Sequence, residues 1–412
     1  FSLLTDFEEL AVYDCRSRPS DKHKASVGRH NFYTFEEYPD RWREIWDVFS
    51  REAVWGGSLD RIQLGKGTSE VDAEFLREIE GWRDVLARTM ALRNPRLGID
   101  DLNDAVQRTI DRILFLRMAE DRGIEPYEQL GRLAEKEGVY SELIDLCGKA
   151  NAKYNAGLFD LSPKGDPITP KLSVDDRVLK PIITGLYFPQ CPYEFSVLPI
   201  MVLGNIYEQF LGKVIRLTAA HQAKVEEKPE VRKAGGVFYT PTYIVDYNVK
   251  NTVGKLVEGK SPKQLASFRV LDMACGSGSF LLGAYQFLLD YYLNWYVEHN
   301  PEKQTQAVWK RGEEWRLTIA EKKRILTTHI FGVDIDRQAV EVTKLSLLLK
   351  VLEGESTETL QMALPGFQER ALPNLDNNIK CGNSLIGPDY FTGQLMPDPD
   401  ELRRVNPFDW EH

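Results

Sequence analysis

The sequence of 412 residues has few cysteines and histidines, and neither residue type is grouped. Its five cysteines are Cys15, Cys147, Cys191, Cys275 and Cys381, and no two of them form a C-x-x-C pair. The six histidines show no H-E-x-x-H or comparable spacing of metal ligands. An odd number of scattered thiols is typical of a reducing compartment, so we expect free cysteines, a cytoplasmic location and no structural metal.

Long hydrophobic runs are also missing. No apolar stretch approaches the roughly 18 residues that a membrane-spanning helix needs. The first ten residues carry Asp6, Glu8 and Glu9 where a secretory signal has a basic region before an apolar core. We therefore expect neither a membrane span nor a secretory leader.

Basic residues are not in excess. Lysine and arginine number 52 against 62 aspartates and glutamates, which gives a formal net charge of −10. This balance excludes a protein that coats polyanions with its whole surface, but it is compatible with a local basic groove. Hydrophobic residues at 42% and charged residues at 28% are typical of globular proteins. At about 100–200 residues per domain, the length predicts two or three domains.

The amino-terminal part alternates between polar and apolar residues. Phe1–Asp14 reads as the last strands of a sheet, and because the chain starts without Met in mid-pattern, we expect a fragment. A polar linker is predicted from Arg16 to about His30. The aromatic residues between Tyr33 and Phe49 predict a helix that packs on a neighbour, with a base-stacking platform as the alternative.

Helical patterns dominate the next two hundred residues. Apolar spacing predicts the helices Val71–Ala91, Ile99–Arg122, Glu142–Asn151 and Leu198–Val214. The second of them interleaves arginines with acids, which favours intramolecular ion pairs between helices over phosphate contacts. A charged hinge, Ala223–Lys233, is predicted to separate this helical region from the following domain.

A glycine loop begins the segment that carries chemistry. Arg269–Leu282 predicts a short buried strand, a turn containing Gly276 and Gly278, and a helix. The glycines let the backbone approach a ligand, and the helix start presents free N–H groups. The third position of G-x-G-x-x-G is Leu281, and no Gly-Lys-Ser or Gly-Lys-Thr follows the loop, so cofactor phosphates are not favoured.

Two further strand ends point to an adenosine ligand. The run Thr328–Asp336 predicts a strand ending on Asp334, where an acid of a parallel sheet can accept hydrogen bonds from a ribose diol. A third strand in Asn378–Ile386 puts Asn383 where its amide could read an adenine ring. Ribose binding without a favoured pyrophosphate suggests S-adenosylmethionine.

The four motifs together resemble a known family. In Gly235–Val245, Thr240 is predicted to cap a helix that begins at Pro241. The order Gly-x-Phe-Tyr-Thr-Pro, Asp-x-Ala-Cys-Gly-Ser-Gly-x-Phe, Gly-Val-Asp-Ile-Asp and Cys-Gly-Asn-Ser-Leu, between Gly235 and Leu385, resembles the gamma-class DNA adenine-N6 methyltransferases. In particular it is similar to those fused to a nuclease in type IIG restriction-modification enzymes and in BREX-like phage-defence enzymes.

The resemblance implies an α/β fold, with the amino-terminal half of a Rossmann-like, S-adenosylmethionine-dependent methyltransferase sheet preceded by an all-α connector. The implied domains are the tail of a nuclease-like domain (1–16), a linker with an aromatic helix (17–70), a helical connector (71–232) and an incomplete S-adenosylmethionine-binding methyltransferase domain (233–412). The implied activity is site-specific methylation of a flipped adenine in double-stranded DNA. The implied partners are duplex DNA and a nuclease domain in the same parent polypeptide.

Individual roles follow from the same resemblance. Phe238, Tyr239 and Thr240 would hold the methionine carboxylate of the cofactor, and Asp272 its amino group. Asp334 would bind the ribose hydroxyls, Ile335 would stack on adenine, and Asn383, where the family more often has Asp, would meet the exocyclic amine. The expected cofactor-binding residues are Phe238, Tyr239, Thr240, Pro241, Asp272, Ala274, Cys275, Gly276, Gly278, Phe280, Asp334, Ile335 and Asn383.

The catalytic loop of the family, Asn-Pro-Pro-aromatic, does not occur in the sequence. Asn406–Trp410 is similar to it, but Pro397–Arg404 precedes it in place of an apolar strand, so we expect it not to be that loop. No P-D…E-x-K nuclease site is evident either. We therefore expect no catalytic residue here, and an isolated chain that binds S-adenosylmethionine without methylating or cleaving DNA. The alternatives are a regulatory S-adenosylmethionine-binding module and an RNA or protein methyltransferase.

Overall fold

The computed structural model describes residues 2–13, 29–55, 58–59, 71–154, 157–188, 190–191, 195, 212–228, 240–312, 314–355, 359, 372–393 and 398–411. The chain divides into two compact units, Phe1–Glu78 and Ile79–His412. Within the described ranges, no helix is long and apolar enough to cross a membrane.

The described part of the first unit contains an antiparallel sheet of order β1-β2-β3, followed by helices α1 and α2. The strands are β1 (Ser2–Thr5), β2 (Glu9–Tyr13) and β3 (Arg29–Thr34), and the helices are α1 (Tyr38–Phe49) and α2 (Arg51–Trp55). Val12, Tyr33 and Ile45 form its buried cluster. The predicted end of the linker at about His30 is wrong, because β3 already begins at Arg29. In this strand Tyr33 is paired with Leu10 of β2. Tyr33 therefore belongs to a strand, and the predicted aromatic helix begins only at Tyr38.

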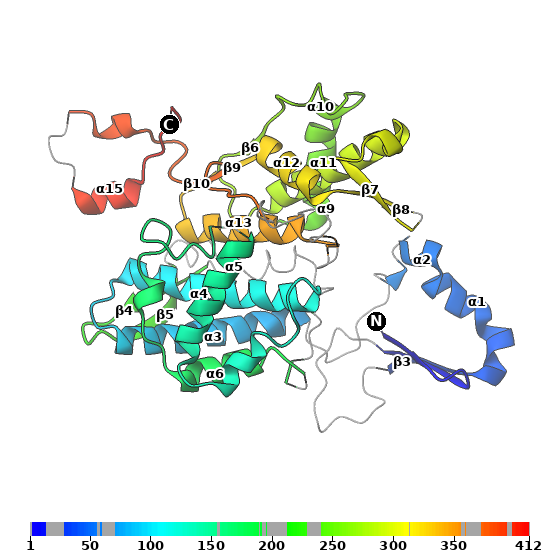
Figure 1. Cartoon of the computed structure of the whole chain (residues 1–412), viewed down its shortest axis with the longest axis horizontal. Helices are drawn as coiled ribbons and strands as arrows, with labels where there is room; N and C mark the ends of the chain where they lie inside the picture. The colour runs from blue at the N-terminus through cyan, green and yellow to red at the C-terminus, as the bar shows by residue number, and fades with distance from the viewer. Residues whose placement is uncertain are drawn as a thin grey trace. The chain divides into compact units, whose positions relative to one another are not determined.

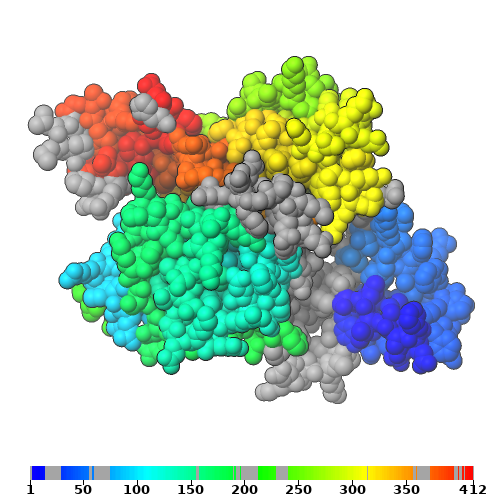
Figure 2. Space-filling model, viewed as in Figure 1, coloured from blue at the N-terminus to red at the C-terminus, as the bar shows by residue number. Residues whose placement is uncertain are grey.

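Four helices begin the described part of the second unit. They are α3 (Val71–Arg93), which starts before the boundary between the units, α4 (Ile99–Asp121), α5 (Val139–Tyr154) and α6 (Asp176–Thr184). Short 3-10 turns occur at Gly131–Glu135 and Thr169–Lys171. Helices α4 and α5 appear in cyan and green in Figure 1 and form part of one continuous surface in Figure 2.

Helix α4 is buried along nearly its whole length, charged residues included. Arg108 pairs with Asp104, Arg112 with Asp166, and Arg117 with Asp121. The prediction that these arginines make ion pairs inside the protein is confirmed, but the prediction that the pairs join different helices is wrong, because two of them lie within α4 and Asp166 lies in a loop. Burial removes them from contact with a nucleic acid.

The expectation of an all-α connector is wrong in one segment. Strands β4 (Lys213–Leu217) and β5 (Ala223–Glu227) form an antiparallel hairpin where the end of a helix and a charged hinge were predicted. Asn103 on α4 explains part of this. Its side chain donates to the Ile215 carbonyl at 2.9 Å and accepts from the Ile215 N–H at 3.0 Å, which satisfies the outer edge of β4. Residues 198–211 of the predicted helix lie outside the described residues.

A parallel sheet of order β10-β9-β6 lies in the rest of the unit (Figure 1). Its strands are β6 (Val270–Asp272), β9 (Ile330–Asp334) and β10 (Ile379–Cys381). Helices α11 (Ser279–Glu298), α12 (Ile319–His329) and α13 (Arg337–Val351) connect and pack against them. The mixed α/β class with a parallel sheet is therefore as predicted. Strand β6 was expected to be buried, but Leu271 is 48% exposed.

The remaining elements surround this sheet. Helix α9 (Thr242–Val249) continues through a π-helical turn (Lys250–Gly254) into α10 (Lys255–Val257) and packs on α11. Strands β7 (Val308–Arg311) and β8 (Glu314–Leu317) form a hairpin, with a 3-10 turn at Pro301–Lys303 before it. A 3-10 turn at Pro388–Phe391 and helix α15 (Pro399–Val405) follow the sheet.

Candidate cofactor site

The polar residues singled out in the sequence lie at one edge of the parallel sheet. Asp272 ends β6, Asp334 ends β9, and Asn383 follows the end of β10. In the ladder, Cys381 is opposite Asp334 and Asp272 is opposite Gly332. Carboxyl ends of parallel strands meet at a common edge, which we call the cofactor edge.

The glycine loop folds against the end of β9. The Cys275 N–H donates to the Val333 carbonyl at 3.0 Å, and the Gly276 N–H donates to Asp334 Oδ2 at 2.8 Å. Gly276 and Gly278 have φ values of 53° and 85°, in the left-handed region that favours glycine. A β-carbon on Gly278 would lie 2.8 Å from Thr343 Cγ2, whereas no atom lies within 4 Å of the same position on Gly276. Gly278 therefore permits close packing against Thr343, and Gly276 leaves open space beside the loop.

The Asp334 carboxylate is half-buried and held by two backbone groups. Its Oδ2 accepts from Gly276, and its Oδ1 accepts from the Asp336 N–H at 2.8 Å. Burial raises the pKa of Asp334 above its ordinary value; the two N–H donors oppose the shift, and the charges of Asp336 and Asp272 add to it. Lys228, which follows β5, forms an ion pair with Asp336. Each carboxylate oxygen of Asp334 keeps a lone pair for a further donor.

Asn383 is fixed by its own turn and by a neighbouring segment. Its Oδ1 accepts from the Leu385 N–H at 3.1 Å, and its backbone N–H donates to the Asn406 carbonyl at 2.6 Å. The next residue, Ser384, donates through its hydroxyl to the Met273 carbonyl at 2.7 Å. The loops after β6 and β10 are thus joined across the end of β9.

Apolar and small residues complete the cofactor edge. Ile335 is 51% exposed directly after Asp334, and Met273 is exposed in the loop after β6. Ala274 is exposed and its N–H donates to Asp272 Oδ1 at 3.1 Å, while Phe280 is half-buried on α11. Cys275 is buried, and this raises the pKa of its thiol to about 12, so Cys275 packs as a neutral residue.

The upstream motif is described only in part. Phe238 and Tyr239 lie outside the described residues. Thr240 does not cap a helix that begins at Pro241, contrary to the prediction. Pro241 has an extended ψ of 142° and itself occupies the capping position, so α9 begins at Thr242. Helix α9 then packs closely on α11, with Val245 against Gly283.

Three residues of the site were given no role from the sequence. Thr343 on α13 donates to the Gly276 carbonyl at 2.8 Å, Asp336 caps α13 and bonds Lys228, and Ser384 reaches Met273. Of these, only the cap of α13 could have been read from the chain, since Asp336 directly precedes a helical pattern. The contacts of Thr343 and Ser384 depend on the tertiary fold.

The chain also contains the nucleotide pattern G-x-x-x-x-G-K-S at Gly254–Ser261. A phosphate loop of this kind connects a strand to a helix. Here Gly254 is the last residue of the π-helical turn and leads directly into α10, so the start of the pattern is helical. The pattern therefore lacks the context of a phosphate site.

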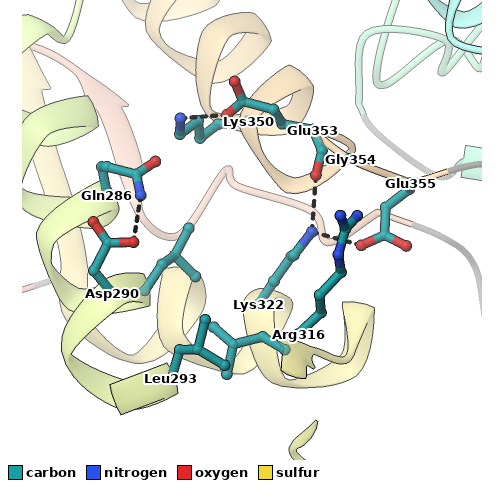
Figure 3. A pocket seen from close by; sticks show the side chains of 11 residues that line it. Gln286, Asp290, Leu293, Arg316, Lys322, Lys350, Glu353, Gly354 and Glu355 are labelled. Carbon is teal, nitrogen blue, oxygen red and sulfur yellow. Dashed lines mark hydrogen bonds and ion pairs between the residues drawn. The ribbon is translucent and has the colours of Figure 1, made fainter. Parts of the chain in front are cut away.

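A pocket of about 330 Å³ lies away from the cofactor edge. It is lined by the middle of α11, the start of α12 and the end of α13, and Figure 3 shows its charged groups bonded to one another. Lys322 pairs with Glu355, Lys350 with Glu353, and Gln286 donates to Asp290. Asp334 lies just before the start of α13, and Lys350 of the pocket lies near the end of that helix. The length of α13 puts roughly 20 Å between the two, so the pocket is not part of the cofactor edge. In the described part of the chain, no group of three or more His, Cys, Asp or Glu could hold a metal ion.

Comparison with known proteins gives a consistent answer. Residues 250–388 match the family described as "MmeI, DNA-methyltransferase domain". The type II restriction enzyme and methyltransferase RM.Eco57I of Escherichia coli is 36% identical over 99% of this chain, which covers 39% of that protein. A putative type II restriction enzyme and methyltransferase of Methanocaldococcus jannaschii is 25% identical, over 68% of this chain and 27% of that protein.

Two more distant similarities extend the set. The adenine-specific methyltransferase BrxX of Escherichia coli is 25% identical over 52% of this chain and 18% of that protein. The solved DrdV–DNA complex aligns with 92% of this chain and 31% of that chain, at 13% identity and a TM-score of 0.32, which is too low to assign a fold. The resemblance to adenine methyltransferases of restriction-modification and BREX-like enzymes is confirmed by the sequence relatives. The chain spans about two fifths or less of their length.

Proposed function

We propose that this chain, a relative of the type II restriction enzymes that carry a methyltransferase, is the S-adenosylmethionine-binding part of a DNA adenine-N6 methyltransferase. The parent enzyme would methylate adenine in duplex DNA and carry a nuclease domain in the same polypeptide. The names of the relatives support both statements. The order β10-β9-β6 supports assigning the sheet to the amino-terminal half of a Rossmann-like methyltransferase.

One observation carries the proposal: the open carboxylate of Asp334 beside the glycine loop. An acid at the end of the second strand, with spare lone pairs on both oxygens, suits the two hydroxyls of a ribose. The space over Gly276 lets a ligand approach the backbone. The exposed side chain of Ile335 next to the carboxylate suits the face of an adenine ring.

The other residues fit the same cofactor. Asn383 would meet the exocyclic amine of adenine, and Asp272 would accept from the cofactor ammonium group. Phe238, Tyr239, Thr240 and Pro241 would hold the cofactor carboxylate. Ala274, Cys275, Gly278 and Phe280 would line or support the pocket. Among these, Cys275 acts through packing, because its thiol is buried and neutral.

The chain's own contribution is binding and orientation. When bound, S-adenosylmethionine supplies a methyl group activated by its sulfonium charge. Asp334 and Asn383 would fix the nucleoside at the cofactor edge. The glycine loop, which has no side chains at Gly276 and Gly278, would let the cofactor approach the backbone. The sequence contains no Asn-Pro-Pro loop to hold the target adenine. We therefore assign these residues to cofactor binding and none to the methyl acceptor.

Calorimetric titration with S-adenosylmethionine tests this function. Asp334→Ala removes the acceptor of two hydroxyl groups, so we expect affinity to fall about 10- to 100-fold, as for lost hydrogen bonds to a charged group. Asp290→Ala is the matched control, because Asp290 bonds Gln286 on the exposed side of α11 and should leave affinity unchanged. Failure of the wild-type chain to bind, or an unchanged affinity in Asp334→Ala, would overturn the assignment.

A further inference from the structure

We propose that Asn406–Trp410 is a clasp that positions Asn383 for the adenine of the cofactor, with Trp410 as a positioning residue. This inference rests on the proposed function and deepens it. The clasp follows helix α15 and returns to Asn383, the second residue after β10 (Figure 1).

Backbone bonds hold the residues around Asn383 from both sides. On the inner side, the Gly382 N–H donates to the Asp334 carbonyl at 2.9 Å. On the outer side, the Asn383 N–H donates to the Asn406 carbonyl at 2.6 Å, and Asn383 forms a parallel bridge with Pro407. The Phe408 N–H then donates to the Ile386 carbonyl at 2.9 Å. The clasp therefore acts as a short extra strand beside the residue that would read adenine.

Side chains extend this contact towards the glycine loop. The Trp410 indole N–H donates to the Ser384 carbonyl at 3.1 Å, and the Ser384 hydroxyl donates to the Met273 carbonyl at 2.7 Å. The rings of Phe408 and Trp410 pack edge to face with centroids 4.7 Å apart. One chain of contacts thus runs from the clasp through the loop after β10 to the loop after β6.

The glycine before Asn383 is part of the same device. A β-carbon on Gly382 would lie 2.8 Å from Phe408 Cδ2 and 3.3 Å from Phe408 Cα. Because the backbone of Phe408 is involved as well as its ring, the ring cannot relieve this contact by turning alone. Close approach of the clasp to β10 therefore requires glycine at this position.

The groups of Asn406 are already in use. Its carbonyl accepts from Asn383, and its side-chain amide lies 3.5 Å from Cys381 Sγ. A helix, α15, precedes it where a catalytic loop of the family follows a strand. These contacts give Asn406–Trp410 a supporting role at the cofactor site and agree with the expectation that it is not the catalytic loop.

The test compares two ligands that differ only at the edge Asn383 would read. S-adenosylhomocysteine carries the 6-amino group, and its inosine counterpart, S-inosylhomocysteine, carries a 6-oxo group. Trp410→Phe keeps an aromatic ring but removes the bond to Ser384. We expect the affinity of Trp410→Phe for the adenine ligand to fall about 3- to 10-fold, as for one lost hydrogen bond, and its affinity for the inosine ligand to stay the same.

Further variants separate positioning from general damage. Gly382→Ala displaces Phe408 and should reduce the preference for adenine in the same direction. In Asn383→Ala, adding Trp410→Phe should cause no further loss, since both act at one contact. Trp42→Phe, which changes an exposed tryptophan of the first unit, should leave both affinities unchanged.

The outcomes distinguish this inference from the proposed function. If the wild-type chain binds neither S-adenosylmethionine nor S-adenosylhomocysteine, both fail. If it binds, but Trp410→Phe and Gly382→Ala keep the full preference for adenine, only the clasp is overturned. An equal loss for both ligands would also overturn it, because the effect would then not pass through Asn383.

Discussion

Arg112 in helix α4 and Asp334 at the end of β9 are both partly or wholly withdrawn from water, but their surroundings differ. Arg112 is 1% exposed and donates to the Leu158 carbonyl, the Thr169 hydroxyl and the Asp166 carboxylate at 2.6–2.8 Å. Asp334 accepts two backbone N–H groups, one of them from Gly276, where a β-carbon would have no atom within 4 Å. The first site is closed by its own partners, and the second keeps acceptors for something else.

The two carboxylates near these sites, Asp166 and Asp334, also differ in the direction of their pKa shifts. Burial alone would raise the pKa of Asp166, but its bonds to Thr169 and the charge of Arg112 outweigh that effect and hold its pKa below its ordinary value. At Asp334 the effect of burial exceeds that of the two backbone N–H donors, and its pKa is raised. The charge of Asp166 is paired with a buried cation, so removing that cation would be costly, whereas Asp334 is held by backbone N–H groups, and we propose it as the ligand-binding carboxylate.

The largest expected effect comes from breaking the closed site. Arg112→Met keeps the length of the side chain but leaves the Asp166 charge buried without its cation. We expect the free energy of unfolding of the second unit to fall by about 3–5 kcal/mol, measured by urea denaturation. Affinity for S-adenosylmethionine, measured where the variant is folded, should not change.

A surface pair provides the control for that loss. Arg88 pairs with Asp84 one turn away on α3 and is 67% exposed, so Arg88→Met should cost no more than about 0.5 kcal/mol. If Arg112→Met were equally mild, the buried pair would not support the helical region. Replacing Asp166 as well should recover part of the loss, because the unpaired charge is then removed.

The sequence anticipated much of the cofactor edge but less of its support. Asp272, Asp334 and Asn383 could be placed because each follows a short apolar run, and parallel strands align such ends. The β4–β5 hairpin could not, since its charged strands are fixed by Asn103 at a separation of 112 residues. The bond from Ser384 to Met273 spans 111 residues, and no local pattern encodes it.

Two glycines of the loop after β6, Gly276 and Gly278, differ in the same way as the two charged sites. Gly278→Ala would put a methyl group 2.8 Å from Thr343 Cγ2 at a φ of 85°. We expect a loss of about 2–4 kcal/mol in unfolding free energy, from the left-handed conformation and from overpacking. Gly276→Ala meets no atom within 4 Å, so only the conformational cost of about 1–2 kcal/mol applies to its stability.

Substitution of Gly276 should also change the affinity for S-adenosylmethionine, for a reason separate from stability. The methyl group of Gly276→Ala would occupy the open space over Gly276 through which we propose that the ligand approaches, so we expect S-adenosylmethionine affinity to fall tenfold or more, about 1.4 kcal/mol. Gly81→Ala, in helix α3 with nothing within 4 Å, is the control and should stabilise by roughly 0.5–1 kcal/mol. Equal affinities in Gly276→Ala and the wild-type protein would show that the open space over Gly276 is not part of the binding site.

The smallest expected effect lies at the other end of β9, where His329 is fully buried. Its Nδ1–H donates to the Phe268 carbonyl, and the Tyr292 hydroxyl lies 2.8 Å from its Nε2. Burial lowers the pKa of His329 below 6.5. The unfolded chain therefore binds a proton near pH 6.5 that the folded chain does not, and stability must fall as pH drops below that value.

The slope of unfolding free energy against pH measures this linkage. We expect His329 to contribute a loss of at most about 1.4 kcal/mol per pH unit below pH 6.5, and none above it. His329→Gln should flatten the acid side of the profile relative to wild type, although it lowers stability at pH 7. His299→Gln, at an exposed position after α11, should keep the wild-type slope. An unchanged slope in His329→Gln would mean that this end of β9 is not closed to protons, and the contrast with Asp334 along one strand would then be lost.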